Sequence, residues 1–210
     1  MIRRNGSFYA RTAVGLAGGL LLAGLGSAAF AAEVGNDGVD VNVEIGENPA
    51  GSLSLSVAAD STSLTEVEGE AASADYREFT GALPEVTVTD TRTEAPEGVY
   101  WYVTGQAGDF VGADGQDAIT PDHLGWTPAL VTDGNGEVAE GPEVESVLDD
   151  AAAPGLEGQE LLELAIDSGE AQAANGAWTA DADLSLKTPN NVEPGSYSST
   201  LTLSLFEEAF

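Results

Sequence analysis

Short runs of alternating apolar and polar residues constrain this chain more than any other feature. In the run 197–205, Leu201, Leu203 and Leu205 share one face with Tyr197, and hydroxyl side chains occupy the other face. A period of two residues is the pattern of a half-buried antiparallel strand. The same alternation recurs in the segments 39–45, 53–57, 86–90, 99–103 and 184–186.

Turn residues separate these runs. They are Asn-Gly, Asp-Gly and Pro-Gly steps, which suit positions where the backbone needs a positive or a fixed φ. Two longer connections, 60–74 and 133–158, are rich in carboxylates and small residues, and we expect irregular surface loops there, the second a flexible insertion. The sequence therefore predicts an all-β fold, an antiparallel Greek-key-like β-sandwich with long acidic loops.

Residues 159–167 fit two periodicities. Leu162, Leu164 and Ile166 alternate as a strand would, whereas Leu161 and Leu164 fit one face of a helix. We favour the strand.

The first 31 residues are typical of a secretory signal peptide. Arg3, Arg4 and Arg11 give a positive beginning, residues 12–26 form a Gly/Ala/Leu-rich core, and small residues precede cleavage after Ala31. A membrane-spanning helix would need about 20 apolar residues, which is more than this core offers. We therefore expect a secreted protein with one domain over 32–210.

The exported part is strongly acidic. Arg77, Arg92 and Lys187 stand against 36 Asp and Glu residues, for a net charge of −33. Such a charge excludes nucleic acid and an anionic membrane leaflet as direct partners. It also repels anionic wall polymers unless salt or divalent cations screen it. The chain has no cysteine, so disulfides do not stabilise it.

Residues that could carry catalysis are scarce. His123 is the single histidine, and no glycine pattern of a nucleophile elbow accompanies it. One histidine without cysteine cannot supply the ligands that zinc prefers. With 36 carboxylates, no pair is singled out for glycoside hydrolysis. We expect no enzymatic activity and no resident cofactor.

Calcium is the one metal that the composition favours, because hard oxygen ligands are plentiful. Asp109, Asp114 and Asp117 cluster near a glycine bend, and a second cluster lies at 133–137. Neither matches the twelve-residue calcium loop with its distal Glu. We take Asp109, Asp114 and Asp117 as the candidate ligands.

Taken in chain order, several segments resemble the WxL domain, a secreted module that binds the wall surface of Gram-positive bacteria. Residues 85–92 resemble its opening strand, and Trp101-Tyr102-Val103 stands where the family has Trp-x-Leu. Residues 124–128 resemble a motif of divergent actinobacterial members, and residues 176–178 lead into a strand at 184–189. The second family motif corresponds to Tyr197, Leu201, Thr202, Leu203 and Leu205.

The resemblance spans about 39–206 and departs from the family at two positions. Val103 replaces the expected Leu and Leu203 replaces the expected Trp, so both positions stay apolar. Tyr100 and Tyr102 point oppositely to Trp101, so one of these two groups is the more exposed. The resemblance implies these binding residues: Trp101, Val103, Trp126, Trp178, Tyr197, Leu201, Thr202, Leu203 and Leu205. For Trp101 and Tyr197 we favour a place in the core or at a strand end, and for Trp126 and Trp178 both alternatives stay open.

The resemblance also implies a β-rich module held non-covalently to peptidoglycan or another wall glycan, beside a membrane-anchored surface protein. The sequence shows no Leu-Pro-x-Thr-Gly signal and no hydrophobic tail, so we expect non-covalent retention at the cell-wall surface. The composition leaves open a second class: a free secreted acidic structural or adhesin-like protein, calcium-stabilised, without wall affinity.

Overall fold

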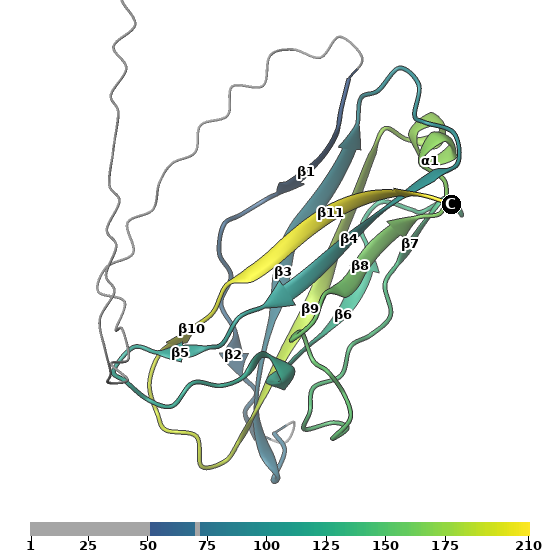
Figure 1. The fold of residues 1–210 in the computed structure, drawn as a ribbon. Coiled ribbons are helices and arrows are strands. Elements are labelled where there is room, and N and C mark those ends of the chain that lie inside the picture. The colour runs from purple at the N-terminus through teal and green to yellow at the C-terminus, as the bar shows by residue number, and fades with distance from the viewer. Residues whose placement is uncertain (1–50, 70–71) are drawn as a thin grey trace, which may run out of the picture. The chain divides into compact units, whose positions relative to one another are not determined.

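The computed structural model describes residues 51–69 and 72–210, and these form two antiparallel β-sheets packed against each other (Figure 1). The all-β sandwich prediction is therefore confirmed. The chain repeatedly passes from one sheet to the other, as a Greek-key-like connectivity requires. The predicted signal peptide and the predicted strand 39–45 lie outside the described residues.

The first sheet, the β3–β9 sheet, has the order β1-β3-β9-β6, and β2 pairs with β3. β1 has the bounds that the alternation predicts, and β3 and β9 are much longer than the runs seen in the sequence. The strands are β1 Leu53–Val57, β2 Thr65–Glu66, β3 Tyr76–Asp90, β6 Leu124–Leu130 and β9 Ala177–Pro189.

The second sheet, the β4–β8 sheet, has the order β11-β4-β8-β7. A separate two-strand pair joins β5 to β10. One short helix, α1, and one 3-10 turn, η2, complete the described elements. Their bounds are β4 Val99–Ala107, β5 Val111–Gly112, η2 Pro121–His123, β7 Val138–Glu140, β8 Glu160–Ala165, α1 Ser168–Ala174, β10 Tyr197–Ser198 and β11 Leu201–Ala209.

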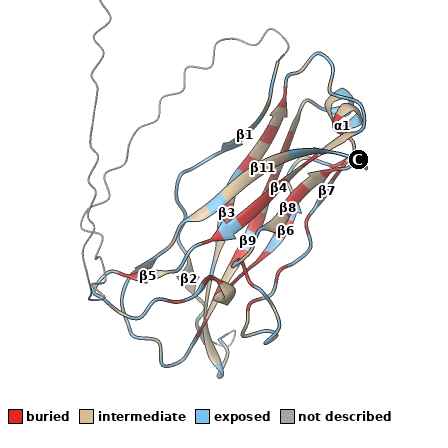
Figure 2. Cartoon of the chain, viewed as in Figure 1, coloured by how far each residue is buried: buried red, intermediate tan, exposed pale blue. Residues whose placement is uncertain are grey.

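The core lies between the two sheets and follows the alternation along their strands. Figure 2 shows buried positions in β3, β4, β8 and β9, which are the inner strands of the two sheets. Trp101, Trp126 and Trp178 are all 2 % exposed or less. Trp126 reaches across to β4, where a Cβ on Gly105 would lie only 2.6 Å from its ring. Glycine at 105 is therefore what lets this indole pack against β4.

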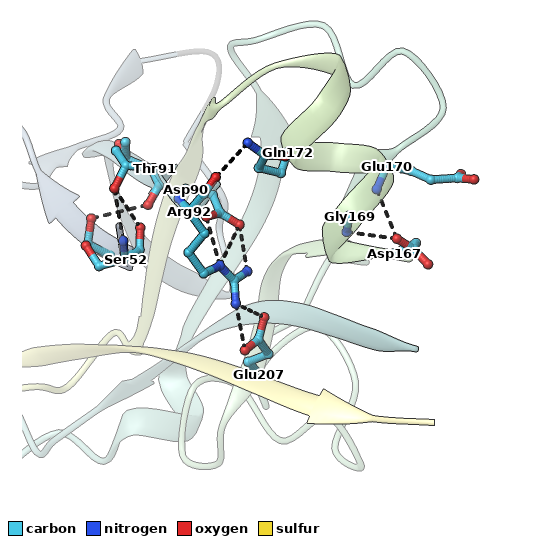
Figure 3. Close-up of polar contacts among 11 residues, drawn as sticks. Ser52, Asp90, Thr91, Arg92, Asp167, Gly169, Glu170, Gln172 and Glu207 are labelled. Atoms are coloured by element: carbon cyan, nitrogen blue, oxygen red, sulfur yellow. Dashed lines mark hydrogen bonds and ion pairs between the residues drawn. The ribbon is translucent and has the colours of Figure 1, made fainter. Parts of the chain in front are cut away.

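Arg92 links the two sheets at one end of the sandwich (Figure 3). Its guanidinium donates to both oxygens of Asp90, which ends β3, at 2.9 Å and 2.6 Å. It also donates to Glu207 in β11 at 3.0 Å. The Arg92 carbonyl accepts a hydrogen bond from Gln172 of α1 at 3.0 Å. Residue 92, which ends the segment 85–92, thus joins β3, β11 and α1.

The connection 133–158 is not the irregular insertion that we expected. It contains β7, and Val144 and Leu156 from it are buried in the core. Val144 exchanges two backbone hydrogen bonds with Trp126, and the Leu156 amide donates to the Leu124 carbonyl at 2.9 Å. These apolar residues within the acidic stretch hold the chain along the outer edge of β6. The other predicted loop, 60–74, likewise contains a strand, β2.

The segment 159–167 forms a strand, β8, as favoured, followed by α1 with Asp167 as its N-cap. The inner and outer residues of β8 do not follow a plain alternation. The register with β4 shifts so that Val103 pairs with Glu163 and Thr104 with Leu161, which leaves Leu162 as an extra residue in a β-bulge. Leu162 and Glu163 are consequently both buried, whereas Ile166 is 57 % exposed.

Candidate binding surface

The segments that correspond to the Trp-x-Leu motif and to the second motif of the resemblance lie on neighbouring strands. β4 and β11 pair antiparallel over nine residues of β11, with Val103 opposite Leu205 and Gly105 opposite Leu203. Figure 1 shows the two strands side by side across the second sheet. Trp101-Tyr102-Val103 and the run after Tyr197 therefore form one strand pair with two faces.

The inner face of this pair holds most of the residues that the resemblance implies. Trp101 and Val103 are buried, and Leu201, Leu203 and Leu205 are half-buried against the same core. Thr202 lies on the opposite face and is exposed. Val103 and Leu203, the two departures from the family, both pack in the core, so they act there as apolar filling.

The remaining predicted binding residues lie apart from this pair. Trp126 and Trp178 are buried on β6 and β9 of the other sheet. Tyr197 is half-buried in β10 and donates its hydroxyl to the Glu193 carbonyl at 2.8 Å. None of these three rings is presented on an open surface, so each contributes first to packing.

The outer face of the same strand pair presents aromatic side chains to solvent. Tyr102 stacks on Phe206, its partner in register, with ring centroids 5.1 Å apart. Tyr100 lies 5.9 Å from Tyr102 and 5.2 Å from Phe210, which is 79 % exposed. Stacked cross-strand aromatics stabilise a sheet and present a continuous apolar surface. We call Tyr100, Tyr102, Phe206, Glu208 and Phe210 the aromatic face.

Glu208 joins the two tyrosines of the aromatic face. The hydroxyls of Tyr100 and Tyr102 donate to its two carboxylate oxygens, each at 2.8 Å. These hydrogen bonds lower the pKa of Glu208 below its ordinary value. The same bonds to a carboxylate raise the pKa of Tyr100 and of Tyr102. At neutral pH the face thus carries one anion bordered by neutral rings.

A partial signal for this face is present in the sequence. Alternation places Tyr100 and Tyr102 opposite Trp101, and the structure shows that the tyrosines are the outer group. Phe206, Glu208 and Phe210 were not among the predicted binding residues, because the predicted run ends at Leu205. β11 continues four residues further, to Ala209. Extending the same parity beyond Leu205 would have placed all three on the tyrosine side.

The candidate calcium ligands Asp109, Asp114 and Asp117 are all exposed. Within residues 51–69 and 72–210, no three acidic or histidine side chains gather closely enough to hold a metal ion. His123 in η2 contacts Asp122 at 3.1 Å and Thr120 at 3.2 Å. In the same part of the chain, no helix is both long and apolar enough to cross a membrane.

The fold and this surface define a class: an antiparallel β-sandwich with an exposed aromatic face. No family model and no curated protein matches the chain. One similar solved structure comes from a study of glycolipid glycan hydrolysis by a family 123 glycoside hydrolase from Clostridium perfringens, at 15% identity and a TM-score of 0.29. The match covers 61% of this chain and 18% of that one. A TM-score this low does not establish a common architecture.

Proposed function

We propose that the protein is a secreted, non-enzymatic module that associates with the bacterial cell wall by binding a wall glycan. The observation that carries the proposal is the aromatic face on β4 and β11. It supports the proposal because the two strands that bear it are those that resemble the WxL motifs.

The chemistry of the aromatic face suits a neutral, hydroxyl-rich chain. An aromatic ring offers apolar surface to the C–H face of a sugar, while its polar handle bonds outward. The Glu208 carboxylate is an acceptor that sugar hydroxyls can reach. An open surface of this kind needs no enclosed pocket, since successive sugars can lie along successive rings.

The strong negative charge restricts where such binding can occur. Anionic wall polymers would be repelled, whereas an uncharged glycan strand would not. Divalent cations could also bridge an acidic protein to an anionic wall. A chelator would abolish bridging by divalent cations and leave binding to an uncharged glycan unchanged.

The test is sedimentation of the protein, with its leader removed, with purified peptidoglycan sacculi across salt concentrations, with and without EDTA. We expect pelleting that survives both high salt and EDTA. The double variant Tyr100→Ala/Tyr102→Ala should remain in the supernatant. Tyr76→Ala is the matched control, because Tyr76 is a half-buried tyrosine of the other sheet, beside Lys187.

Three results would overturn the proposal. Loss of pelleting on EDTA alone would indicate cation bridging, and equal pelleting of the double variant would remove the aromatic face from the mechanism. Absence of pelleting under every condition would favour the other class, a free secreted acidic structural or adhesin-like protein.

A further inference from the structure

A glutamate side chain lies in the core of the sandwich. Glu163 of β8 is 0% exposed, and within the described residues neither of its carboxylate oxygens has a hydrogen-bond partner. An unpaired buried carboxylate is costly, so such a group takes up a proton instead. Burial raises the pKa of Glu163 from 4.5 to about 8.

The β-bulge at Leu162 is what places Glu163 inside. Without the extra residue, the carboxyl and Leu162 would point to opposite faces. With it, Glu163 lies opposite Val103 and shares the inner face with Ala165. The acidic side chain is therefore held in the core by the pairing of β8 with β4.

In the part of the chain that the structure describes, the neighbours of Glu163 offer no counter-charge. The facing inner positions of β4 are Trp101, Val103 and Gly105. Across the core, β8 packs against β6 and β9, whose inner residues are uncharged: Leu124, Trp126, Pro128, Trp178, Ala180, Ala182, Leu184, Leu186 and Thr188.

Within the described residues, the ionisable groups around β8 supply no free positive charge. Glu160, on β8 itself, pairs with Gly105, and burial raises its pKa. On β7, the residue paired with Glu163 is Glu140, an exposed acid of the same sign. In α1, which follows β8, Glu170 is exposed. The buried Asp90 of β3 and Glu207 of β11 both bind Arg92. A proton is thus the available means of neutralising Glu163.

β8 also connects this carboxyl to the aromatic face. Leu164, the next residue, pairs with Tyr102 on one side and with Ala139 of β7 on the other. β7 is an edge strand of three residues, so few backbone hydrogen bonds retain it. Displacement of β8 would remove Leu164 from the side of Tyr102.

We propose that Glu163 is a pH latch: its neutral carboxyl keeps β8 and β7 in place, and its ionisation displaces them and weakens binding at the aromatic face. The link to binding rests on the proposed function, whereas the latch itself does not. The predicted direction is a structure that is tight at neutral and acid pH and loosens in mild alkali.

The first experiment measures stability against pH by urea unfolding of wild type and Glu163→Gln. A carboxyl whose pKa is higher in the folded state stabilises the fold below its unfolded pKa and loses that contribution as pH rises through its folded pKa. The wild-type urea midpoint should therefore fall between pH 4.5 and about 8, and the variant should lack this component. Glu145→Gln, at an exposed acid, should keep the wild-type slope.

A second measurement covers the case in which Glu163→Gln does not fold. Carbon-13 NMR of the glutamate carboxyls in wild type should show one that titrates near pH 8. Titration of every glutamate near 4.5 would overturn the latch, as would equal slopes in wild type and Glu163→Gln.

Sacculus pelleting between pH 6 and about 9 then tests the coupling. We expect wild type to lose pelleting as pH passes about 8, and Glu163→Gln to retain it. Stable pelleting of wild type at high pH, despite falling stability, would overturn the coupling. If neither protein pellets at any pH while the stability difference persists, the proposed function fails and the latch stands.

Discussion

The two sheets of this sandwich have the same kind of inner face and opposite kinds of outer face. On the β3–β9 sheet, the outer positions pair Glu78 with Lys187, Thr80 with Ser185 and Thr87 with Thr179. On the β4–β8 sheet, the corresponding positions form the aromatic face. Alternation dictates which residues enter the core, whereas the solvent side is free to specialise.

On the outer face of the β3–β9 sheet, polar side chains bind to other side chains of the same chain. Thr87 and Thr179 are 2.9 Å apart through their hydroxyls, and Ser185 donates to Glu78 at 2.8 Å. Lys187 is bound by Asp149. The aromatic face instead leaves apolar rings partly exposed, which is the feature expected of a surface that contacts something else. The comparison teaches that the second sheet, not the first, is the side to test for binding.

The largest expected effect comes from removing the side chain that links the two sheets. Arg92→Ala leaves the buried Asp90 unpaired and removes the link to Glu207, so unfolding free energy should fall by about 3–5 kcal/mol. Urea unfolding measures the loss. Arg77→Ala is the control, because the Arg77–Glu66 ion pair is partly exposed and solvent screens it, so its loss should cost much less. Equal losses in the two variants would contradict the role given to Arg92.

The inner face can be disturbed alone through Gly105. Gly105→Ala would place a Cβ 2.6 Å from the Trp126 ring, so the ring or the strand must shift, at a cost of about 1–3 kcal/mol. Thermal unfolding measures it. Gly108→Ala is the matched control, since its Cβ would find no atom nearer than 3.8 Å and should leave stability almost unchanged. An unaffected Gly105→Ala protein would show that the inner packing is looser than described.

The aromatic face can be disturbed with little effect on the core. Tyr102→Ala removes the ring that stacks on both Tyr100 and Phe206, and sacculus affinity should fall about tenfold. Quantitative pelleting measures the affinity. Tyr76→Ala should bind as wild type. A weaker effect from Tyr102→Ala than from Tyr76→Ala would reverse the assignment of the two faces.

The smallest expected effect is a change in the pKa of two tyrosines of the aromatic face. Glu208→Gln removes the carboxylate whose hydrogen bonds raise the pKa of Tyr100 and of Tyr102. Both tyrosines should then titrate at lower pH than in wild type, which ultraviolet difference spectra record. Glu157→Gln, at an exposed acid remote in sequence, should not change the titration. An unchanged tyrosine titration in Glu208→Gln would place the carboxylate away from the rings.

Local alternation predicted the strands but not their partners. The bounds of β1, the end of β3, the beginnings of β4 and β11 and a short part of β9 follow from period-two patterns, because each has one solvated face. The pairing of β4 with β11 joins segments about a hundred residues apart, and no local signal specifies it. The resemblance did bring both segments forward, without indicating that they are adjacent.

The failures have specific physical causes. A single inserted residue at Leu162 reversed the faces of β8, and a bulge leaves no mark in composition. Val144 and Leu156 were overlooked because isolated apolar residues in an acidic stretch have no period. The outer position of Phe206 follows from the same alternation once the predicted strand is extended beyond Leu205. The core was thus largely predictable and the aromatic face was predictable in part, whereas the buried position of Glu163 was not.

The covering of β6 has a consequence for how the protein behaves at high concentration. An open strand at the margin of a sheet is a template for another molecule and can begin fibril growth. Here backbone groups of Leu124 and Trp126 are already bonded to Leu156 and Val144 of the same chain. A neighbouring molecule therefore finds no ladder to extend along this margin, and the acidic chain that crosses it repels any like molecule that approaches.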